Sequence, residues 1–495
     1  MSLDSRTPVL VGGGQVNQRD GRREPVDLLV AAARDAEKES GGSGLLAALD
    51  SIRIVHMLSW RYRDPGALVG ERVGASPRQT AYTSVGGNVP QALVNQAARD
   101  IADGQVDTVL IGGAEAWRTR MRQRASGEQP SWTIQDEAVA PGQVVGTDVA
   151  LLGEDERRIG LDRPSSVYPL FEQAHRIAAG RSIDEQAARS AALWSRFSAV
   201  AAGNPHAWSQ REYSAAEIAT PSPSNRWIAW PYPKLMNSNN MVDQGAALLL
   251  CSVAAARRYG VASDRWVFPH AGTEAQDTRA LAERPGLDRS PAIRVAGRRA
   301  LELADTDLDA LDLVDLYSCF PSAVQVAAAE LGLAIDDPAR PLTQTGGLTF
   351  AGGPWSNYVS HSIATMASAL RSSPGSTGLV TANGGYLTKH VMGVYGTEPP
   401  AAGFRWQDVQ SEVDQEPRTV ALSEWDGTGT VESWTVAHDR DGVPEAAFLA
   451  VRTPEGARTL ATSRDADQLS AMLTRDVAGA AVRITADGDA RLLDT

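Results

Sequence analysis

Cysteine and lysine are scarce in this chain of 495 residues. The two cysteines, Cys251 and Cys319, are too few for a disulfide framework or a four-cysteine zinc site. So low a cysteine content fits a reducing compartment. Only three of the 47 basic residues are lysines, which we attribute to the codon bias of a GC-rich genome. The sequence predicts no metal site.

Long apolar runs and an excess of positive charge are also missing. The longest apolar run, residues 245–256, is too short to cross a bilayer, and the N-terminus has no signal-peptide core. Acidic residues number 60 against 47 basic ones, so the formal net charge is −13. Nucleic-acid binding needs a basic face that neutralises phosphates, which this balance disfavours. We expect a cytoplasmic protein without a membrane span and without a nucleic-acid partner.

Strand-like and helix-like segments alternate through the first part of the chain. A buried strand runs into the glycine turn Gly12-Gly-Gly14, whose spacing is not that of a dinucleotide-binding loop. Further segments follow in the same alternation, with helices at 25–38 and 90–102 and strands at 81–85 and 107–114. Such alternation predicts an α/β fold with a largely parallel sheet.

The same order recurs after residue 290. The helix that begins at Pro25 has a counterpart beginning at Pro291, and Asp107-Thr-Val-Leu-Ile-Gly-Gly is similar to Thr377-Gly-Leu-Val-Thr-Ala-Asn-Gly-Gly. Chance similarity between alanine-rich helices is the alternative. A duplicated core would place an interface between its halves, where active sites commonly lie.

Two regions depart from this pattern. Residues 117–235 are rich in tryptophan and proline, and Ser182-Ile-Asp-Glu185 is a capping box that predicts a helix to about residue 202. We interpret this region as an insertion that covers the first half. After residue 395, short β-type runs begin at 419, 429, 446, 458 and 481, and only 467–473 has helical character. This tail predicts a separate small barrel.

Five segments in this order resemble the thiolase superfamily, most closely the sterol-carrier-protein-type thiolases. They are Asp107-Thr-Val-Leu-Ile-Gly-Gly, Asp243-Gln-Gly-Ala-Ala, Leu316-Tyr-Ser-Cys-Phe, Gly346-Gly-Leu-Thr-Phe-Ala-Gly-Gly-Pro and Thr381-Ala-Asn-Gly-Gly. The tail makes the chain similar to type 1 thiolase-like proteins with an additional C-terminal domain. It also resembles small OB-fold partners of such enzymes, although it has no cysteine for their zinc ribbon.

The resemblance implies a duplicated, five-layer thiolase fold. We expect an N-terminal half over residues 1–255, which includes a covering insertion at about 117–235. A C-terminal half over residues 256–400 and a β-rich, OB-like domain over residues 416–495 would follow. The implied family is that of the acetyl-CoA acetyltransferases, acyltransferases of lipid metabolism.

The usual catalytic set of this family is replaced. A thiolase needs a cysteine nucleophile, a histidine that activates it, and a second cysteine as acid and base. The resemblance places these at Gly86, Gly353 and Ala382. Because none of the three has a reactive side chain, we expect no standard thiolase activity.

Other groups remain as candidates for chemistry. The backbone N–H groups of Gly86 and Gly384 are candidates for an oxyanion hole, because backbone donors need no side chain. Cys319 stands at the cysteine of the family's His-Asp-Cys-Phe motif, although a buried apolar cysteine is as good an interpretation. His390, Tyr317 and Tyr386 are further catalytic candidates, with structural roles as the alternative for each.

Three hypotheses follow for the function. The leading one is a thiolase-like protein that binds CoA or an acyl-CoA as a ligand and holds no tightly bound cofactor. The second is a retro-aldol lyase acting on a β-hydroxyacyl-CoA, in which Tyr317 and Tyr386 transfer protons. The third is a non-catalytic acyl-CoA-binding or regulatory module. We expect a monomer, because the insertion and the fused tail would obstruct the usual dimer interface.

Overall fold

The structure is a computed structural model that describes residues 3–146 and 150–493, built on three β-sheets. The first sheet has the strand order β1-β8-β4-β2-β3-β5. Its strands are β1 (Pro8–Asn17), β2 (Ser51–Ile54), β3 (Gln79–Thr83), β4 (Thr108–Ala116), β5 (Gln143–Val145) and β8 (Asp243–Ser252). Strand β8 is antiparallel to both of its neighbours, whereas β4, β2, β3 and β5 run parallel to one another.

The second sheet repeats the core of the first. Its strands are β9 (Phe268–Gln276), β10 (Leu313–Asp315), β11 (Thr377–Gly384), β12 (Lys389–Gly396) and β13 (Arg405–Asp408). The order β10-β11-β12-β9 reproduces β2-β4-β8-β1, and β12 is again antiparallel to both neighbours. The duplication predicted from the sequence is confirmed.

Helices separate and flank the two sheets. The helices of the core are α1 (Pro25–Ser40), α2 (Pro65–Val73), α3 (Val89–Ala102), α9 (Val253–Arg258), α10 (Pro291–Leu303), α11 (Pro321–Leu331), α12 (Gly347–Phe350) and α13 (Tyr358–Arg371). Helices α3 and α13 contact strands of both sheets, so they form the middle layer. Helix α1 packs on the outer side of the first sheet and α10 on the outer side of the second. The result is the expected arrangement of five layers.

The glycine run near the N-terminus serves packing. A Cβ on Gly12 would collide with the carbonyl oxygen of Ala36, and one on Gly14 with that of Ala32. Both carbonyls belong to α1, so the helix lies directly on β1. The rejection of a dinucleotide site at Gly12-Gly-Gly14 agrees with this contact.

Residues 117–235 form the predicted covering region. It contains α4 (Trp117–Ser126), α5 (Glu154–Ile159), α6 (Pro164–Ala178), α7 (Ile183–Gly203), α8 (Ala215–Ala219), β6 (Trp227–Trp230) and β7 (Tyr232–Pro233). The capping box at Ser182 and Glu185 is present and starts α7 as predicted. Buried Glu172 of α6 accepts hydrogen bonds from Tyr232 and Gln325, at 2.6 and 2.9 Å, and so ties the insertion to α11.

The C-terminal part is β-rich, as expected. Its elements are α14 (Gln410–Val413), β14 (Gly427–His438), β15 (Pro444–Arg452), β16 (Arg458–Ser463), α15 (Ala466–Thr474), β17 (Ala481–Ile484) and β18 (Ala490–Leu492). The β-type run at 419–422 forms only an isolated bridge between Ala421 and Arg458. The sheet is not confined to the tail, because β6 of the covering region pairs with β14. The boundaries proposed for the domains stay predictions.

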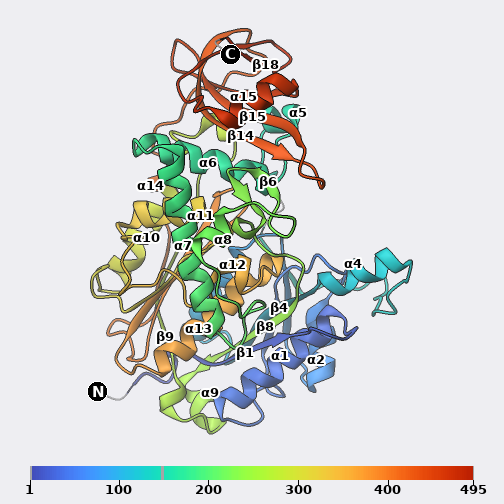
Figure 1. Cartoon of the computed structure of the whole chain (residues 1–495). Coiled ribbons are helices and arrows are strands. Elements are labelled where there is room, and N and C mark those ends of the chain that lie inside the picture. Colours follow the sequence, from blue (N-terminus) through green and yellow to red (C-terminus); the bar gives the residue numbers. More distant parts are fainter. Residues whose placement is uncertain (1–2, 147–149, 494–495) are drawn as a thin grey trace.

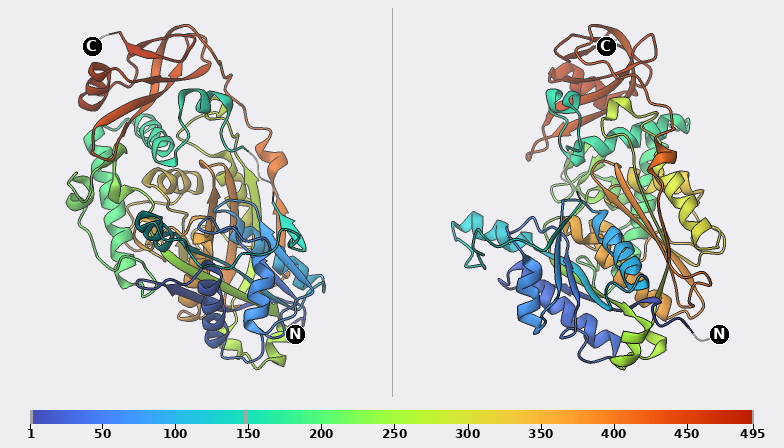
Figure 2. Two further views of the ribbon diagram at one scale, coloured as in Figure 1. Left: turned by 90° about the vertical axis from the view of Figure 1, so that its right-hand side faces the viewer. Right: turned by 180° about the vertical axis from the view of Figure 1, so that it is seen from behind.

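The C-terminal part lies at the end of the molecule opposite the N-terminus (Figure 1, Figure 2). Arg458 is fully buried, forms an ion pair with Glu432 at 2.7 Å, and donates to the carbonyl oxygens of Leu281 and Ala282. Such a side chain fixes β16 to the core, because a buried guanidinium needs all of its partners.

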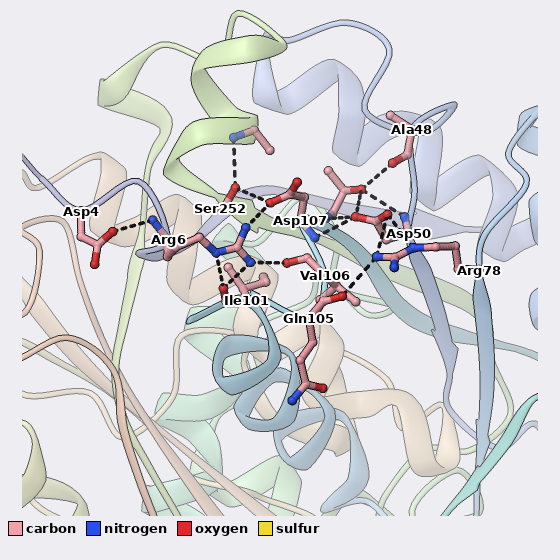
Figure 3. A network of polar contacts seen from close by, with 12 residues as sticks. Asp4, Arg6, Ala48, Asp50, Arg78, Ile101, Gln105, Val106, Asp107 and Ser252 are labelled. Atoms are coloured by element: carbon pink, nitrogen blue, oxygen red, sulfur yellow. Dashed lines mark hydrogen bonds and ion pairs between the residues drawn. The ribbon is translucent and has the colours of Figure 1, made fainter. Parts of the chain in front are cut away.

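A polar network fixes the beginning of the chain (Figure 3). Arg6 forms an ion pair with Asp107 and donates to the carbonyl oxygens of Ile101 and Val106, at 2.9 and 2.8 Å. Asp50 accepts from the backbone N–H of Asp107 at 2.7 Å. The network therefore ties the N-terminal segment to the end of α3 and the start of β4. Within residues 3–146 and 150–493, every helix is too short or too polar to traverse a bilayer.

Candidate functional site

A cavity of about 920 Å³ lies between the two halves and the covering region. It is the largest of the cavities described here, the others measuring about 540 Å³ or less. Five segments provide most of its lining, namely residues 85–87, 237–241, 317–320, 348–356 and 383–386. Side chains of the insertion complete it, among them Tyr168 and Lys234. Three of these segments, 317–320, 348–356 and 383–386, overlap motifs that carry the resemblance described above.

The cavity collects only part of the predicted set. Gly86, Tyr317, Cys319 and Tyr386 line it, whereas Gly353, Ala382, Gly384 and His390 are not among its lining residues. Within the described part of the chain, no group of three or more His, Cys, Asp or Glu side chains is placed to hold a metal ion.

The loop before α3 is closely packed around Gly86. Its backbone N–H donates to the Ser356 hydroxyl at 3.1 Å. A Cβ on Gly86 would collide with Oδ1 of Asn88, and a Cβ on Gly384 would collide with the same atom. The Asn88 carboxamide therefore fills the space between the two glycines. The oxyanion role of Gly86 and Gly384 stays a prediction, and a ligand would have to replace Ser356 at the first of them.

Cys319 belongs to a buried polar cluster. Asn383 donates through Nδ2 to the Tyr168 hydroxyl at 2.9 Å and lies 4.0 Å from the Cys319 sulfur. The Tyr168 hydroxyl donates to the carbonyl oxygen of Gly385 at 3.1 Å. Burial raises the pKa of the Cys319 thiol to about 12. This thiol is protonated at neutral pH, so it lacks the thiolate form that nucleophilic catalysis requires.

Tyr317 lies against the same loop. A Cβ on Gly87 would collide with the Tyr317 hydroxyl, so only glycine fits at position 87. The ring of Tyr317 packs edge-on against Tyr358 with 5.6 Å between the ring centroids. Burial raises the pKa of Tyr317 well above its usual value. The phenol therefore stays protonated at neutral pH and lies at the cavity wall, beside the loop that leads into α3.

Tyr386 and His390 have partners that direct them elsewhere. The Tyr386 hydroxyl donates to the carbonyl oxygen of Asp162 at 2.8 Å. This bond links the turn after β11 to the covering region. His390 is buried, and its Nε2 lies 3.3 Å from Asp277 Oδ2 and 3.4 Å from the Ser290 hydroxyl. Ser290 caps α10. His390 therefore lies beside the start of α10, near a separate cavity of about 320 Å³, rather than with Cys319.

Three residues at the site escaped the sequence reasoning about chemistry. Asn88 follows Gly86 by two residues, and the sequence pattern assigns no role to its carboxamide. Tyr168 and Ser356 reach the site only through long-range contacts, from α6 and from the turn before α13. A local pattern gives no signal for such contacts, because burial against distant segments decides them.

Comparisons with known proteins agree with this geometry. Residues 408–489 match the family described as "Thiolase-like protein type 1 additional C-terminal domain". An acetyl-CoA acetyltransferase of Methanocaldococcus jannaschii is 23% identical over 266 residues, which span 54% of this chain and 60% of that protein. The structure of an acetyl-CoA acetyltransferase from Syntrophomonas wolfei superposes with a TM-score of 0.58 at 15% identity, over 80% of this chain and 100% of that one. The fold is thus that of the thiolase superfamily.

A solved structure defines the family more narrowly. The crystal structure of a monomeric SCP2-thiolase-like protein type 1 from Mycobacterium smegmatis superposes with a TM-score of 0.84. It is 33% identical and covers 99% of this chain and 100% of its own. The chain belongs to the SCP2-thiolase-like proteins type 1, which carry an additional C-terminal domain.

Proposed function

We propose that this protein binds CoA thioesters in the 920 Å³ cavity and does not catalyse the standard thiolase reaction. The observation that carries the proposal is the packing at Gly86, where Asn88 occupies the space that a nucleophilic side chain would need. The other two catalytic positions are Gly353 and Ala382, which provide no acid or base. The family relationship supports CoA thioesters as the ligand class.

The cavity suits such a ligand in shape and charge. Cavities that bind small molecules usually measure about 300–1,000 Å³ and are mostly apolar with a few polar groups. Here Leu348, Phe350 and Phe320 supply apolar surface. Lys234 is exposed and also lines the cavity, whereas nearby Arg211 forms an ion pair with Glu217 at 2.5 Å. We therefore expect Lys234 to face the phosphates of the ligand.

Binding is tested by calorimetric titration with CoA, acetyl-CoA and a longer acyl-CoA, together with an assay for cleavage of acetoacetyl-CoA. We expect saturable binding and no thiolytic product. Val85→Trp would fill the cavity and should weaken binding at least tenfold, because Val85 is exposed on the cavity wall. Val443→Trp is the matched control in a turn of the C-terminal part. Absence of binding, or turnover of acetoacetyl-CoA, would contradict the proposal.

A retro-aldol reaction remains a second candidate because of one observation. The Tyr317 hydroxyl is at the cavity wall beside Gly87, where it can give a proton to a ligand. Tyr386 is a weaker candidate, since its hydroxyl is bound to Asp162. If the reaction occurs with a β-hydroxyacyl-CoA, Tyr317→Phe should abolish product formation and Tyr386→Phe should reduce it less. Equal activity of both variants and the wild type would exclude this role.

We also propose that the protein is a monomer. Strand β3 would be the open edge of the first sheet, but β5 of the same chain pairs with it through residues 143–145. The edge of β3 is therefore not available for pairing with a second chain, and the short strand β5 is the outermost strand on that side. The relative from Mycobacterium smegmatis is described as monomeric. Light scattering coupled to size-exclusion chromatography tests this, and a mass of twice 52.6 kDa would contradict it.

A further inference from the structure

Helix α4 concentrates positively charged side chains. Its sequence contains Arg118, Arg120, Arg122 and Arg124 and no acidic residue. Among residues 3–146 and 150–493, none of these four arginines forms an ion pair. The chain as a whole has a net charge of −13, so the charge of this helix is opposite in sign to that of the whole chain. The helix projects from the body of the molecule in Figure 1 and in the right-hand view of Figure 2.

Contacts extend this charge into a continuous patch. Arg19 and Arg118 lie 4.1 and 5.7 Å from the centroid of the same Trp208 ring. Arg120 lies 5.4 Å from the centroid of the Trp60 ring. The residue that follows Trp60 in the sequence is Arg61, which is exposed. We define the basic patch as the following residues: Arg19, Arg61, Arg118, Arg120, Arg122 and Arg124.

The basic patch adjoins the mouth of the cavity. Trp117, the first residue of α4, packs edge-on against Trp355 with 5.3 Å between ring centroids, and Trp355 lines the cavity. The backbone N–H of Arg118 donates to the carbonyl oxygen of Val242 at 3.3 Å, directly after Met241. Met241 lines the cavity and its side chain is 48% exposed. An anionic surface on α4 would therefore be held at the cavity entrance.

The geometry of the charge favours a large partner over a free nucleotide. Residues two apart on a helix are about 200° apart around its axis, so Arg118 and Arg122 lie on one side and Arg120 and Arg124 on the other. A helix of ten residues is about 15 Å long. A protein with a concave surface can contact the arginines on both sides of a projecting helix. A flat membrane would contact the arginines on one side only.

We infer that the basic patch docks an acidic carrier protein that presents its acyl group on a phosphopantetheine arm. This inference rests on the proposed function, because the same arm forms the part of CoA that would enter the cavity. An acylated carrier and an acyl-CoA share the thioester and the phosphopantetheine arm. They differ in the part that stays outside the cavity, which is a protein in the first and a nucleotide in the second. Attraction between oppositely charged surfaces would align the carrier so that its arm points toward Met241 and the cavity.

The test compares two ligands and two charge-reversed proteins. The ligands are hexanoyl-CoA and an acidic acyl carrier protein that bears a hexanoyl phosphopantetheine arm, and binding is measured by surface plasmon resonance at low and physiological salt. The variant is Arg120→Glu with Arg124→Glu. The matched control is Arg440→Glu with Arg464→Glu, a pair of exposed arginines in the C-terminal part.

We expect the carrier to bind the wild type with strong salt dependence. The α4 variant should bind the carrier at least tenfold more weakly than the wild type does. The affinities of the α4 variant and of the control variant for hexanoyl-CoA should both lie within twofold of the wild-type affinity. Carrier binding that the α4 variant leaves unchanged would overturn the inference, as would hexanoyl-CoA binding without carrier binding. Binding to phosphatidylserine vesicles that the α4 variant abolishes would instead assign the patch to a membrane. If hexanoyl-CoA does not bind either, the proposed function fails as well.

Discussion

The backbone N–H of Gly86 donates a hydrogen bond to the Ser356 hydroxyl over 3.1 Å, which joins the loop before α3 to the turn before α13. This bond occupies a donor that the predicted oxyanion hole would use. On its other side, Oδ1 of Asn88 lies where a Cβ on Gly86 would be, so a side chain at residue 86 requires the Asn88 carboxamide to move. A cysteine introduced at this position is therefore a direct test of the proposal that the site does not catalyse the thiolase reaction.

We predict that Gly86→Cys does not form an acyl-enzyme. The new Cβ would collide with Asn88 Oδ1, and overpacking of this kind costs about 1–3 kcal/mol of unfolding free energy. Gly86→Cys combined with Asn88→Ala should recover most of that stability. Urea unfolding measures the cost, and intact mass after incubation with acetyl-CoA detects acylation. An added acetyl group on residue 86 would contradict the prediction.

Cys319 should resist alkylation in the folded protein. Burial raises the pKa of its thiol to about 12, so at pH 8 the thiolate is on the order of one molecule in ten thousand. In a Cys251→Ala background, iodoacetamide should modify residue 319 only slowly between pH 7 and 9, and fully in urea. A fast reaction with a midpoint near the ordinary thiol pKa of about 8.5 would count against this description.

Glu115 should make stability fall as pH rises toward neutrality. Burial raises the pKa of its carboxyl from 4.5 to about 7, even though the backbone N–H groups of Leu58 and Ser59 donate to it at 2.7 Å. Between about pH 4.5 and pH 7 the carboxyl is protonated in the folded state and ionised in the unfolded chain. Its stabilising contribution is therefore complete below pH 4.5 and is lost as pH rises through 7.

The Glu115→Gln variant should lack the pH-dependent part of the stability that comes from Glu115. The difference in unfolding free energy between wild type and variant should change by about 1–3 kcal/mol across that range. Urea unfolding at several pH values measures it, and comparison with the variant cancels the titration of other buried carboxyls. Parallel curves for the two proteins would show that Glu115 is ionised throughout.

Arg458 should be far more important for stability than its neighbour Arg452. Both donate to Glu432, but Arg458 is fully buried and Arg452 is 31% exposed. Arg458→Ala leaves Glu432 with fewer partners and removes a donor from the carbonyl oxygens of Leu281 and Ala282, so we expect a loss of about 3–5 kcal/mol. Arg452→Ala should cost at most about 1 kcal/mol. Similar losses in thermal or urea unfolding would refute the anchoring role.

The sequence by itself was sufficient wherever short-range patterns decide structure. The capping box at Ser182 and Glu185 specifies the start of α7, because both partners lie within one helical turn. The alternation of strands and helices predicted the α/β fold, and the recurrence of their order after residue 290 predicted the duplicated core. That residue 86 is a glycine is likewise a fact of the sequence, and no packing can give glycine a thiol.

Only the tertiary structure decided which groups share the cavity. His390 follows Gly384 by six residues, yet it lies beside Asp277 and Ser290, because the chain reverses between β11 and β12 before reaching it. Tyr168 comes to Asn383 from a helix of the covering insertion. The pairing of β6 with β14 is equally invisible in local patterns. Contacts between segments distant in sequence depend on how whole layers pack. The residue types alone therefore led to the expectation of no standard thiolase activity, whereas the fold determined which side chains fill the site.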